Sequence, residues 1–244
     1  MHTTILSRRA AMDSAWICLP AGWLGQAIWQ GRLSDLPSLA LAAAQPLLLF
    51  LHGSSGLNEQ TRQYQDWLAE SLGLASIAPD SFAQAERPVY RSPAAVGEYE
   101  AVHDLRQQEI AAALACLKTL AWVDDEKIIL AGSSEGGVAA ARWPGREFAA
   151  RIVYSWPCED NYFVETANNG FGADCRLLNI LSDHDPFFAA DSAFNQGRNV
   201  DGDSRKALAG MRHARLARLP DAPHTLYNLP AARRLAADFL QPLL

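Results

Sequence analysis

The stretch that decides the fold is Lys127-Ile128-Ile129-Leu130-Ala131-Gly132-Ser133-Ser134-Glu135-Gly136-Gly137, which an alanine-rich segment follows. Its first residues form the short apolar run that is typical of a buried strand, and the segment after the glycines favours a helix. Between them, Gly132-x-Ser134-x-Gly136 places a serine at a sharp strand-to-helix turn. Such a turn exposes the serine hydroxyl, and its crowded backbone needs glycine on both sides. The stretch therefore predicts Ser134, rather than its neighbour Ser133, as a nucleophile at the end of a strand.

Apolar runs alternate with helical patterns along the rest of the chain. The expected strands are residues 15–19, 47–51, 75–78, 127–131, 152–154, 177–181 and 214–219, and the clearest helices cover about 97–120 and the residues from about 230 onward. This alternation predicts an α/β fold with a mostly parallel central sheet and helices on both faces. We expect a single domain over residues 1–244, with irregular loop insertions at about 80–96 and 157–174.

The composition excludes several classes of protein. The chain has 244 residues, of which 49% are hydrophobic and 20% are charged, as is usual for a folded globular protein. Its net charge of -6 argues against a nucleic-acid partner, which usually meets a basic face. No apolar run reaches the roughly 18 residues that span a bilayer. Ser7-Arg8-Arg9 resembles part of a twin-arginine export signal, but the segment after it lacks a clean apolar region, so we expect a cytoplasmic protein.

A serine nucleophile needs a base that removes its proton. Of the six histidines, His184 and His224 lie where expected strands end, and ligands of such sheets bind beyond those ends. His224 follows the last expected strand and precedes the last helix, which matches the known chain order Ser…Asp…His. The sequence therefore predicts His224 as the base.

The third member of such a triad is an acid that orients the imidazole. Asp183 and Asp185 both follow the expected strand at 177–181. Asp185 lies four residues past Leu181 and precedes Pro186, and we favour it as the acid. Asp183 would then cap a helix or face solvent.

An acyl-transfer enzyme also needs N–H groups aimed at the oxyanion that forms during attack. One donor should be the backbone N–H of Glu135, the residue after the nucleophile. The second should come from the turn His52-Gly53-Ser54-Ser55-Gly56 after the strand at 47–51, and we expect it to be the N–H of Ser54.

These residues together resemble the α/β-hydrolase family from about residue 45 to the C-terminus. The features that stand in the family's order are the His52-Gly53 turn, the Gly132-x-Ser134-x-Gly136 elbow, Asp185-Pro186 and His224. Residues 78–82 (Ala-Pro-Asp-Ser-Phe) and 106–110 (Arg-Gln-Gln-Glu-Ile) resemble the dienelactone-hydrolase-like branch. Its namesake enzymes use a cysteine nucleophile, whereas this chain has Ser134.

The resemblance implies hydrolysis of a carboxylic ester, lactone or thioester of a small molecule through an acyl-enzyme. In that scheme His224 takes the proton of Ser134, and Asp185 holds the tautomer. The resemblance implies no metal and no organic cofactor. Two alternatives are an acyltransferase that uses the same triad and a non-catalytic small-molecule-binding protein with this fold. The sequence makes no prediction of the oligomeric state.

Three further groups of residues have open roles in the sequence. Arg87 and Arg91 could clamp a substrate carboxylate or could simply be solvated. An apolar substrate pocket or the core could hold the aromatic residues Tyr154, Trp156, Tyr162, Phe163, Phe187 and Phe188. Cys158 and Cys175 lie near the ends of the insertion at 157–174 and could pair, although free thiols are the default in the cytosol.

Overall fold

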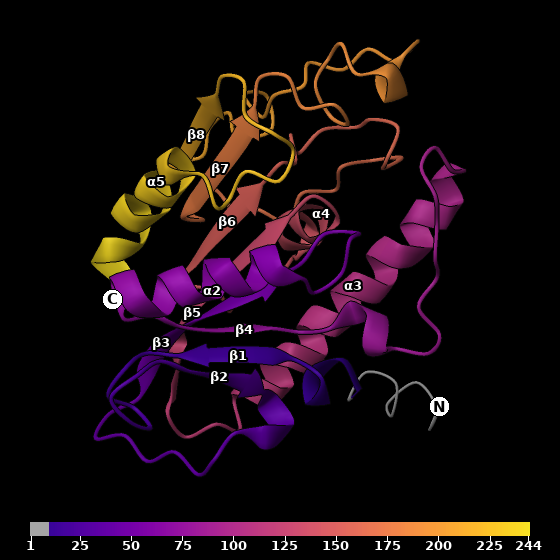
Figure 1. The fold of residues 1–244 in the computed structure, drawn as a ribbon. Helices are drawn as coiled ribbons and strands as arrows, with labels where there is room; N and C mark the ends of the chain where they lie inside the picture. The colour runs from indigo at the N-terminus through magenta and orange to yellow at the C-terminus, as the bar shows by residue number, and fades with distance from the viewer. Residues whose placement is uncertain (1–9) are drawn as a thin grey trace.

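The computed structural model of the protein describes residues 10–244, so Ser7-Arg8-Arg9 lies outside the described residues. One sheet runs through the fold in the strand order β2-β1-β4-β3-β5-β6-β7-β8 (Figure 1). The strands are β1 (Trp16–Leu19), β2 (Trp29–Arg32), β3 (Gln45–Leu51), β4 (Ala75–Ala78), β5 (Val123–Ser133), β6 (Ala150–Tyr154), β7 (Leu177–Ser182) and β8 (Ala214–Leu219). In sheet order, the six strands β4, β3, β5, β6, β7 and β8 are parallel to one another, whereas β1 is antiparallel to both β2 and β4. The predicted, mostly parallel α/β sheet is thereby confirmed.

Two pairs of helices cover the two faces of the sheet. The helices are α2 (Glu59–Leu72), α3 (Val96–Leu117), α4 (Glu135–Arg142) and α5 (Pro230–Leu240). The central strand β3 shows the division, because successive side chains of a strand point to opposite faces. Leu47 and Leu49 belong to the core cluster that contains α3 and α4 residues, and Leu48 and Phe50 belong to the cluster that contains α2 and α5 residues.

The strand bounds differ from the expected ones where the local sequence has no apolar run. Strand β2 was not predicted, because it is a short, half-exposed edge strand with the sequence Trp-Gln-Gly-Arg. Strand β5 begins at Val123, four residues before the expected start, because the intervening Asp124, Asp125 and Glu126 are largely outside the core. Extended backbone at a sheet edge or before the core does not require apolar side chains, so periodicity does not detect it.

Two largely irregular segments lie beside the carboxyl ends of the strands. Residues 80–96 contain only the short helix η2 (Ser81–Ala83) before α3 begins, and residues 157–174 contain only an isolated bridge between Asn161 and Val164. Cys158 and Cys175 are both free thiols. Among residues 10–244, no helix combines the length and hydrophobicity that a membrane crossing requires.

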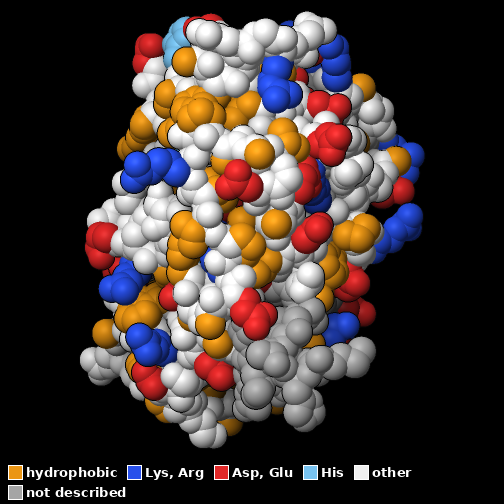
Figure 2. All heavy atoms as spheres, turned by 90° about the vertical axis from the view of Figure 1, so that its right-hand side faces the viewer, with side chains coloured by type: hydrophobic (Ala, Val, Ile, Leu, Met, Phe, Trp, Pro, Cys, Tyr) orange, Lys and Arg blue, Asp and Glu red, His pale blue; other side chains and the backbone are white. Residues whose placement is uncertain are grey.

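The surface carries charges of both signs. On the face shown in Figure 2, Lys and Arg side chains are scattered among Asp and Glu, with hydrophobic side chains between them. No large basic patch forms on the described part of this face.

Candidate active site

The predicted elbow lies between β5 and α4, and Ser134 has the backbone angles φ 55° and ψ -117°. A positive φ is strained for a residue with a side chain, and such strain is concentrated at functional sites. The flanking glycines permit this turn, because a Cβ at Gly132 would collide with the carbonyl of Gly136, and a Cβ at Gly136 would collide with the carbonyl of Leu51. The Gly-x-Ser-x-Gly spacing is thus a steric requirement of the turn.

The structure brings His224 and Asp185 together. His224 Nδ1 lies 2.7 Å from Asp185 Oδ2, to which it donates a hydrogen bond. The other carboxylate oxygen, Oδ1, accepts the backbone N–H groups of Phe187 at 2.9 Å and Phe188 at 3.2 Å. The hydroxyl of Ser155 donates to the carbonyl of His224 and so ties the histidine loop to the end of β6. These bonds fix the orientation of both side chains, because the carboxylate can only accept.

The other candidates at the end of β7 lie elsewhere. Asp183 pairs with Arg218 of the neighbouring strand β8, at the protein surface. His184 is exposed. Of the two aspartates that the sequence left open, Asp185 is the one that contacts His224.

The turn that carries Ser54 lies beside the elbow, because β3 and β5 are neighbours and Leu51 stands opposite Gly132 in the register. A Cβ at Gly53 would lie 3.4 Å from Cβ of Ser134. The backbone N–H of Glu135 belongs to the first residue of α4. The two expected oxyanion donors therefore come from segments that meet at Ser134.

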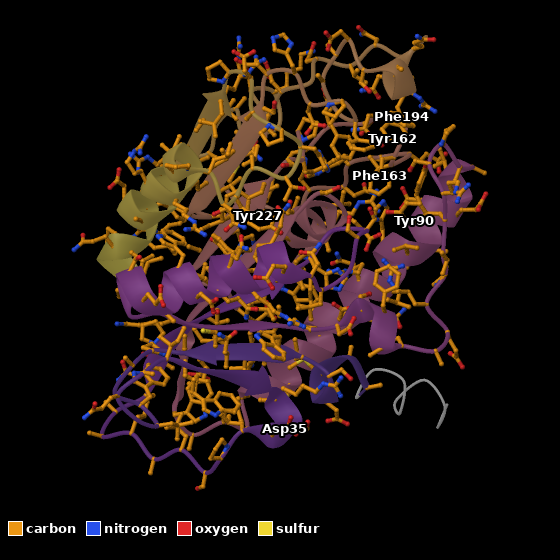
Figure 3. All side chains as sticks on the ribbon, viewed as in Figure 1. Asp35, Tyr90, Tyr162, Phe163, Phe194 and Tyr227 are labelled. Carbon is orange, nitrogen blue, oxygen red and sulfur yellow. The ribbon has the colours of Figure 1, made fainter. Side chains whose placement is uncertain are left out.

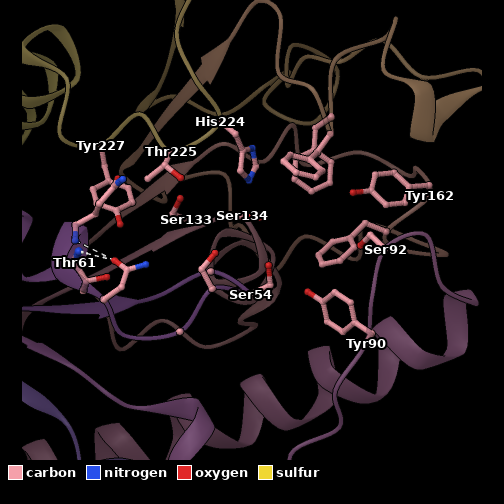
Figure 4. Close-up of a pocket in the computed structure, with 18 residues that line it drawn as sticks. Ser54, Thr61, Tyr90, Ser92, Ser133, Ser134, Tyr162, His224, Thr225 and Tyr227 are labelled. Atoms are coloured by element: carbon pink, nitrogen blue, oxygen red, sulfur yellow. Dashed lines mark hydrogen bonds between the residues drawn. The ribbon is translucent and has the colours of Figure 1, made fainter.

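A pocket of about 310 Å³ opens at these residues. Figure 4 shows Tyr90, Ser92 and Tyr162 on one side of it, Thr61 and Tyr227 on the other, and His224 between them. Ser54 and Ser134 also line it. None of the described residues that line the pocket is Asp, Glu, Lys or Arg. The pocket is therefore polar on its hydroxyl-rich side but carries no fixed charge.

The aromatic residues fall into two groups. Tyr162, Phe163, Phe187 and Phe188 line the pocket. The ring of Phe187 packs edge-on against that of His224, with 4.7 Å between the centroids. Figure 3 shows Tyr90, Tyr162, Phe163 and Phe194 gathered on one side of the site. Tyr154 and Trp156 are instead buried in the core, where the Tyr154 hydroxyl lies 2.8 Å from that of Tyr64.

Arg87 has neither of the roles that the sequence suggested, since it neither lines the pocket as a clamp for a substrate carboxylate nor is solvated at the surface. Its side chain is buried, and its guanidinium lies 2.6 Å from Glu135 Oε1. Arg91 is exposed, and neither arginine is among the residues that line the pocket. Sequence reasoning therefore missed the side-chain role of Glu135. The available signal was an acidic residue between an apolar strand and an alanine-rich helix, because a buried charge requires a partner.

No group of three or more His, Cys, Asp or Glu among residues 10–244 is arranged to hold a metal ion.

No protein-family model and no curated protein sequence matches the chain. Solved structures do match it. A putative dienelactone hydrolase from Klebsiella pneumoniae subsp. pneumoniae has a TM-score of 0.59 and 13% identity, over 95% of this chain and 99% of its own. The esterase PE8 has a TM-score of 0.58 and 19% identity, over 83% and 94%. Est1E from Butyrivibrio proteoclasticus, in a structure with ferulic acid bound, has a TM-score of 0.58 and 16% identity, over 94% of each chain.

These similarities concern the fold. The chain has a single-domain α/β-hydrolase fold, of the form that dienelactone hydrolases also have.

Proposed function

We propose that the protein is a serine hydrolase that cleaves an uncharged carboxylic ester, lactone or thioester of a small molecule. The observation that carries the proposal is the 2.7 Å hydrogen bond between His224 and Asp185, in a pocket that Ser134 also lines. A nucleophile, a base and an orienting acid on three separate loops are the elements of acyl transfer through a covalent intermediate.

In the proposed reaction, Ser134 Oγ attacks the carbonyl carbon while His224 Nε2 takes the hydroxyl proton. The N–H groups of Ser54 and Glu135 stabilise the oxyanion. His224 then gives the proton to the leaving alcohol or thiol, and the acyl group stays on Ser134. A water molecule, deprotonated by His224, attacks the carbonyl carbon of the acyl-enzyme. The bond to Ser134 Oγ then breaks, His224 returns the proton to Ser134, and the acid is released. Asp185 keeps the imidazole in the required tautomer and stabilises its charged form.

The lining of the pocket supports an uncharged substrate. A carboxylate near the reacting bond would have no cationic partner among the described lining residues, and desolvating it unpaired is costly. The aromatic side would accommodate an apolar or aromatic group, since such pockets gain affinity mainly from apolar burial. The similar protein Est1E binds ferulic acid, which is an aromatic carboxylic acid. Esters of aromatic acids therefore belong among the test substrates.

A fluorophosphonate probe tests the proposal directly, because it labels only an activated serine. We expect one adduct, on Ser134, and loss of both labelling and hydrolysis of p-nitrophenyl butyrate in Ser134→Ala. Ser133→Ala is the matched control and should still form the adduct. Labelling absent from the folded wild-type protein would contradict the proposal.

A further inference from the structure

Behind the elbow lies a group of buried ionisable side chains that the triad does not use. Arg87, Arg106, Glu109 and Glu135 are all less than 10% exposed, and we call them the buried ion cluster. Arg87 Nη2 lies 2.6 Å from Glu135 Oε1, and Arg106 Nη1 lies 3.7 Å from the same oxygen. Burying charges costs free energy that an apolar core would not, so the cluster calls for a functional reason.

The buried ion cluster also contacts the turn that carries Ser54, through the first residue of that turn, His52. Arg106 donates from Nη2 to the carbonyl of His52 at 3.0 Å. His52 in turn accepts the N–H of Ser81 on Nε2 at 3.1 Å and contacts the Gly53 carbonyl through Nδ1 at 2.7 Å. Burial, and next the charge of Arg106, lower the pKa of His52 well below its usual value, so it serves the turn as a neutral imidazole.

Tyr90 connects the cluster to the other side of the turn. Its hydroxyl donates to Glu135 Oε2 at 2.7 Å. Figure 4 shows this hydroxyl pointing toward Ser54, which lines the pocket beside it. A carboxylate has no proton to give, so the single proton of the Tyr90 hydroxyl is committed to Glu135. In the side-chain hydrogen bond between Tyr90 and Ser54, the tyrosine oxygen therefore accepts from the Ser54 hydroxyl.

The position of Tyr90 is itself fixed by the cluster. Arg87 donates from Nε to the hydroxyl of Ser81 at 3.0 Å and from Nη1 to the carbonyl of Pro88 at 2.8 Å. Burial, followed by the negative charge of Glu135, raises the pKa of Tyr90, so its hydroxyl keeps its proton at neutral pH. The segment at 80–96 thus has a defined conformation although it is largely irregular.

We propose that Tyr90 is a positioning residue for the reaction proposed above: held by Glu135, its hydroxyl fixes the Ser54 side chain and thereby aims the Ser54 N–H at the oxyanion. The inference rests on the proposed function. Tyr90 acts through Ser54 rather than on the reacting atoms. A small displacement of the Ser54 N–H would lower kcat, because the N–H must reach the position of the oxyanion, which differs from that of the substrate's carbonyl oxygen.

A double-mutant cycle with full-length protein tests the link. Tyr90→Phe and Ser54→Ala should each lower kcat for p-nitrophenyl butyrate by at least about tenfold, with KM within about twofold of wild type. The affinity for phenylboronic acid, which forms a tetrahedral adduct with a reactive serine, should fall in parallel. The double variant should lose no more than either single one, because both remove the same interaction.

Tyr99→Phe is the matched control. The hydroxyl of Tyr99 donates to Ser92 Oγ at 3.0 Å and accepts the N–H of Ala94 at 2.8 Å, so it anchors the same segment without touching Glu135. We expect a lower melting temperature and a kcat within about twofold of wild type for this variant.

The other outcomes separate the two proposals. Additive losses, a raised KM, or a wild-type kcat in Tyr90→Phe would overturn the positioning role while the hydrolase proposal stands. If Tyr90→Phe fails to fold, a wild-type kcat in Ser54→Ala overturns the role by itself. A wild-type protein that neither hydrolyses esters nor reacts with fluorophosphonate would remove both proposals.

Discussion

Arg87 and Glu135 form a buried ion pair 2.6 Å long between the segment at 80–96 and the first residue of α4. Removing Arg87 leaves the buried Glu135 carboxylate with only the more distant Arg106, at 3.7 Å, as a charged partner. Arg87→Leu should therefore lower the free energy of unfolding by about 3–5 kcal/mol. Urea denaturation, monitored by tryptophan fluorescence, measures this change in the free energy of unfolding. Arg91→Leu, four residues along in the same segment and exposed, should change it by less than about 0.5 kcal/mol. Equal effects of the two substitutions would contradict this account of the pair.

Asp185→Asn should separate the orienting role proposed for Asp185 from its packing. The amide keeps the shape of the carboxylate, but it favours the wrong imidazole tautomer, so kcat should fall by about 10³–10⁴-fold. Asp183→Asn is the control, because that residue pairs with Arg218 and not with His224. Steady-state kinetics of both variants decides the matter: a large loss in Asp183→Asn would reassign the acid.

The elbow glycines should tolerate no side chain. Gly136→Ala places a methyl group against the carbonyl of Leu51, where backbone on both sides leaves no room to yield. We expect loss of activity and a fall in unfolding free energy of more than about 3 kcal/mol. Gly97→Ala is the contrasting change, since a Cβ at this position of α3 meets nothing within 4 Å. Thermal unfolding should show a neutral or slightly raised melting temperature for that variant.

Buried His103 should make the protein less stable in mild acid. Its Nε2 lies 3.0 Å from the carbonyl of Phe163, and burial lowers its pKa from 6.5 to about 4, with Arg142 adding to the effect and Glu100 opposing it. The unfolded state therefore binds more protons between these two pH values. The stability that neutral His103 contributes is present above pH 6.5 and is lost as the pH falls toward 4, at about 1.4 kcal/mol per pH unit.

Urea unfolding of wild type and His103→Gln across pH 4–7 isolates this contribution. The glutamine amide can still donate to the Phe163 carbonyl but does not titrate, so its stability should fall less steeply with acid. Parallel curves for the two proteins would show that His103 does not titrate as stated.

Local patterns predicted the parts of the fold whose signal lies within a few residues. The strand at 75–78 and the strand at 214–219 were predicted with their observed bounds, and the helix from Pro230 begins where expected. The Gly132-x-Ser134-x-Gly136 spacing also located the elbow, because steric crowding there is a property of the turn itself. Edge strand β2, with half-exposed side chains, gave no comparable signal.

The rest of the site depends on pairs that are distant in sequence. Arg87 and Glu135 are 48 residues apart, and nothing beside either of them indicates the other. For the same reason the sequence favoured Asp185 over Asp183 as the acid but did not show which of the two lies beside His224. Chain order narrowed the acid to two residues, but only the folded arrangement shows which of them contacts the imidazole.

The ion pair between Arg87 and Glu135 also limits how the pocket can change shape. Swinging the segment at 80–96 outward would separate Arg87 from Glu135. The buried Glu135 carboxylate would then keep only Arg106, 3.7 Å away, as a cationic partner, so this motion costs more free energy than an ordinary loop motion. That wall of the pocket therefore does not serve as a lid. Selection among substrates should follow a preformed outline, so evolution toward a new acyl group would have to replace lining side chains such as Tyr162 and Phe187 rather than loosen the backbone.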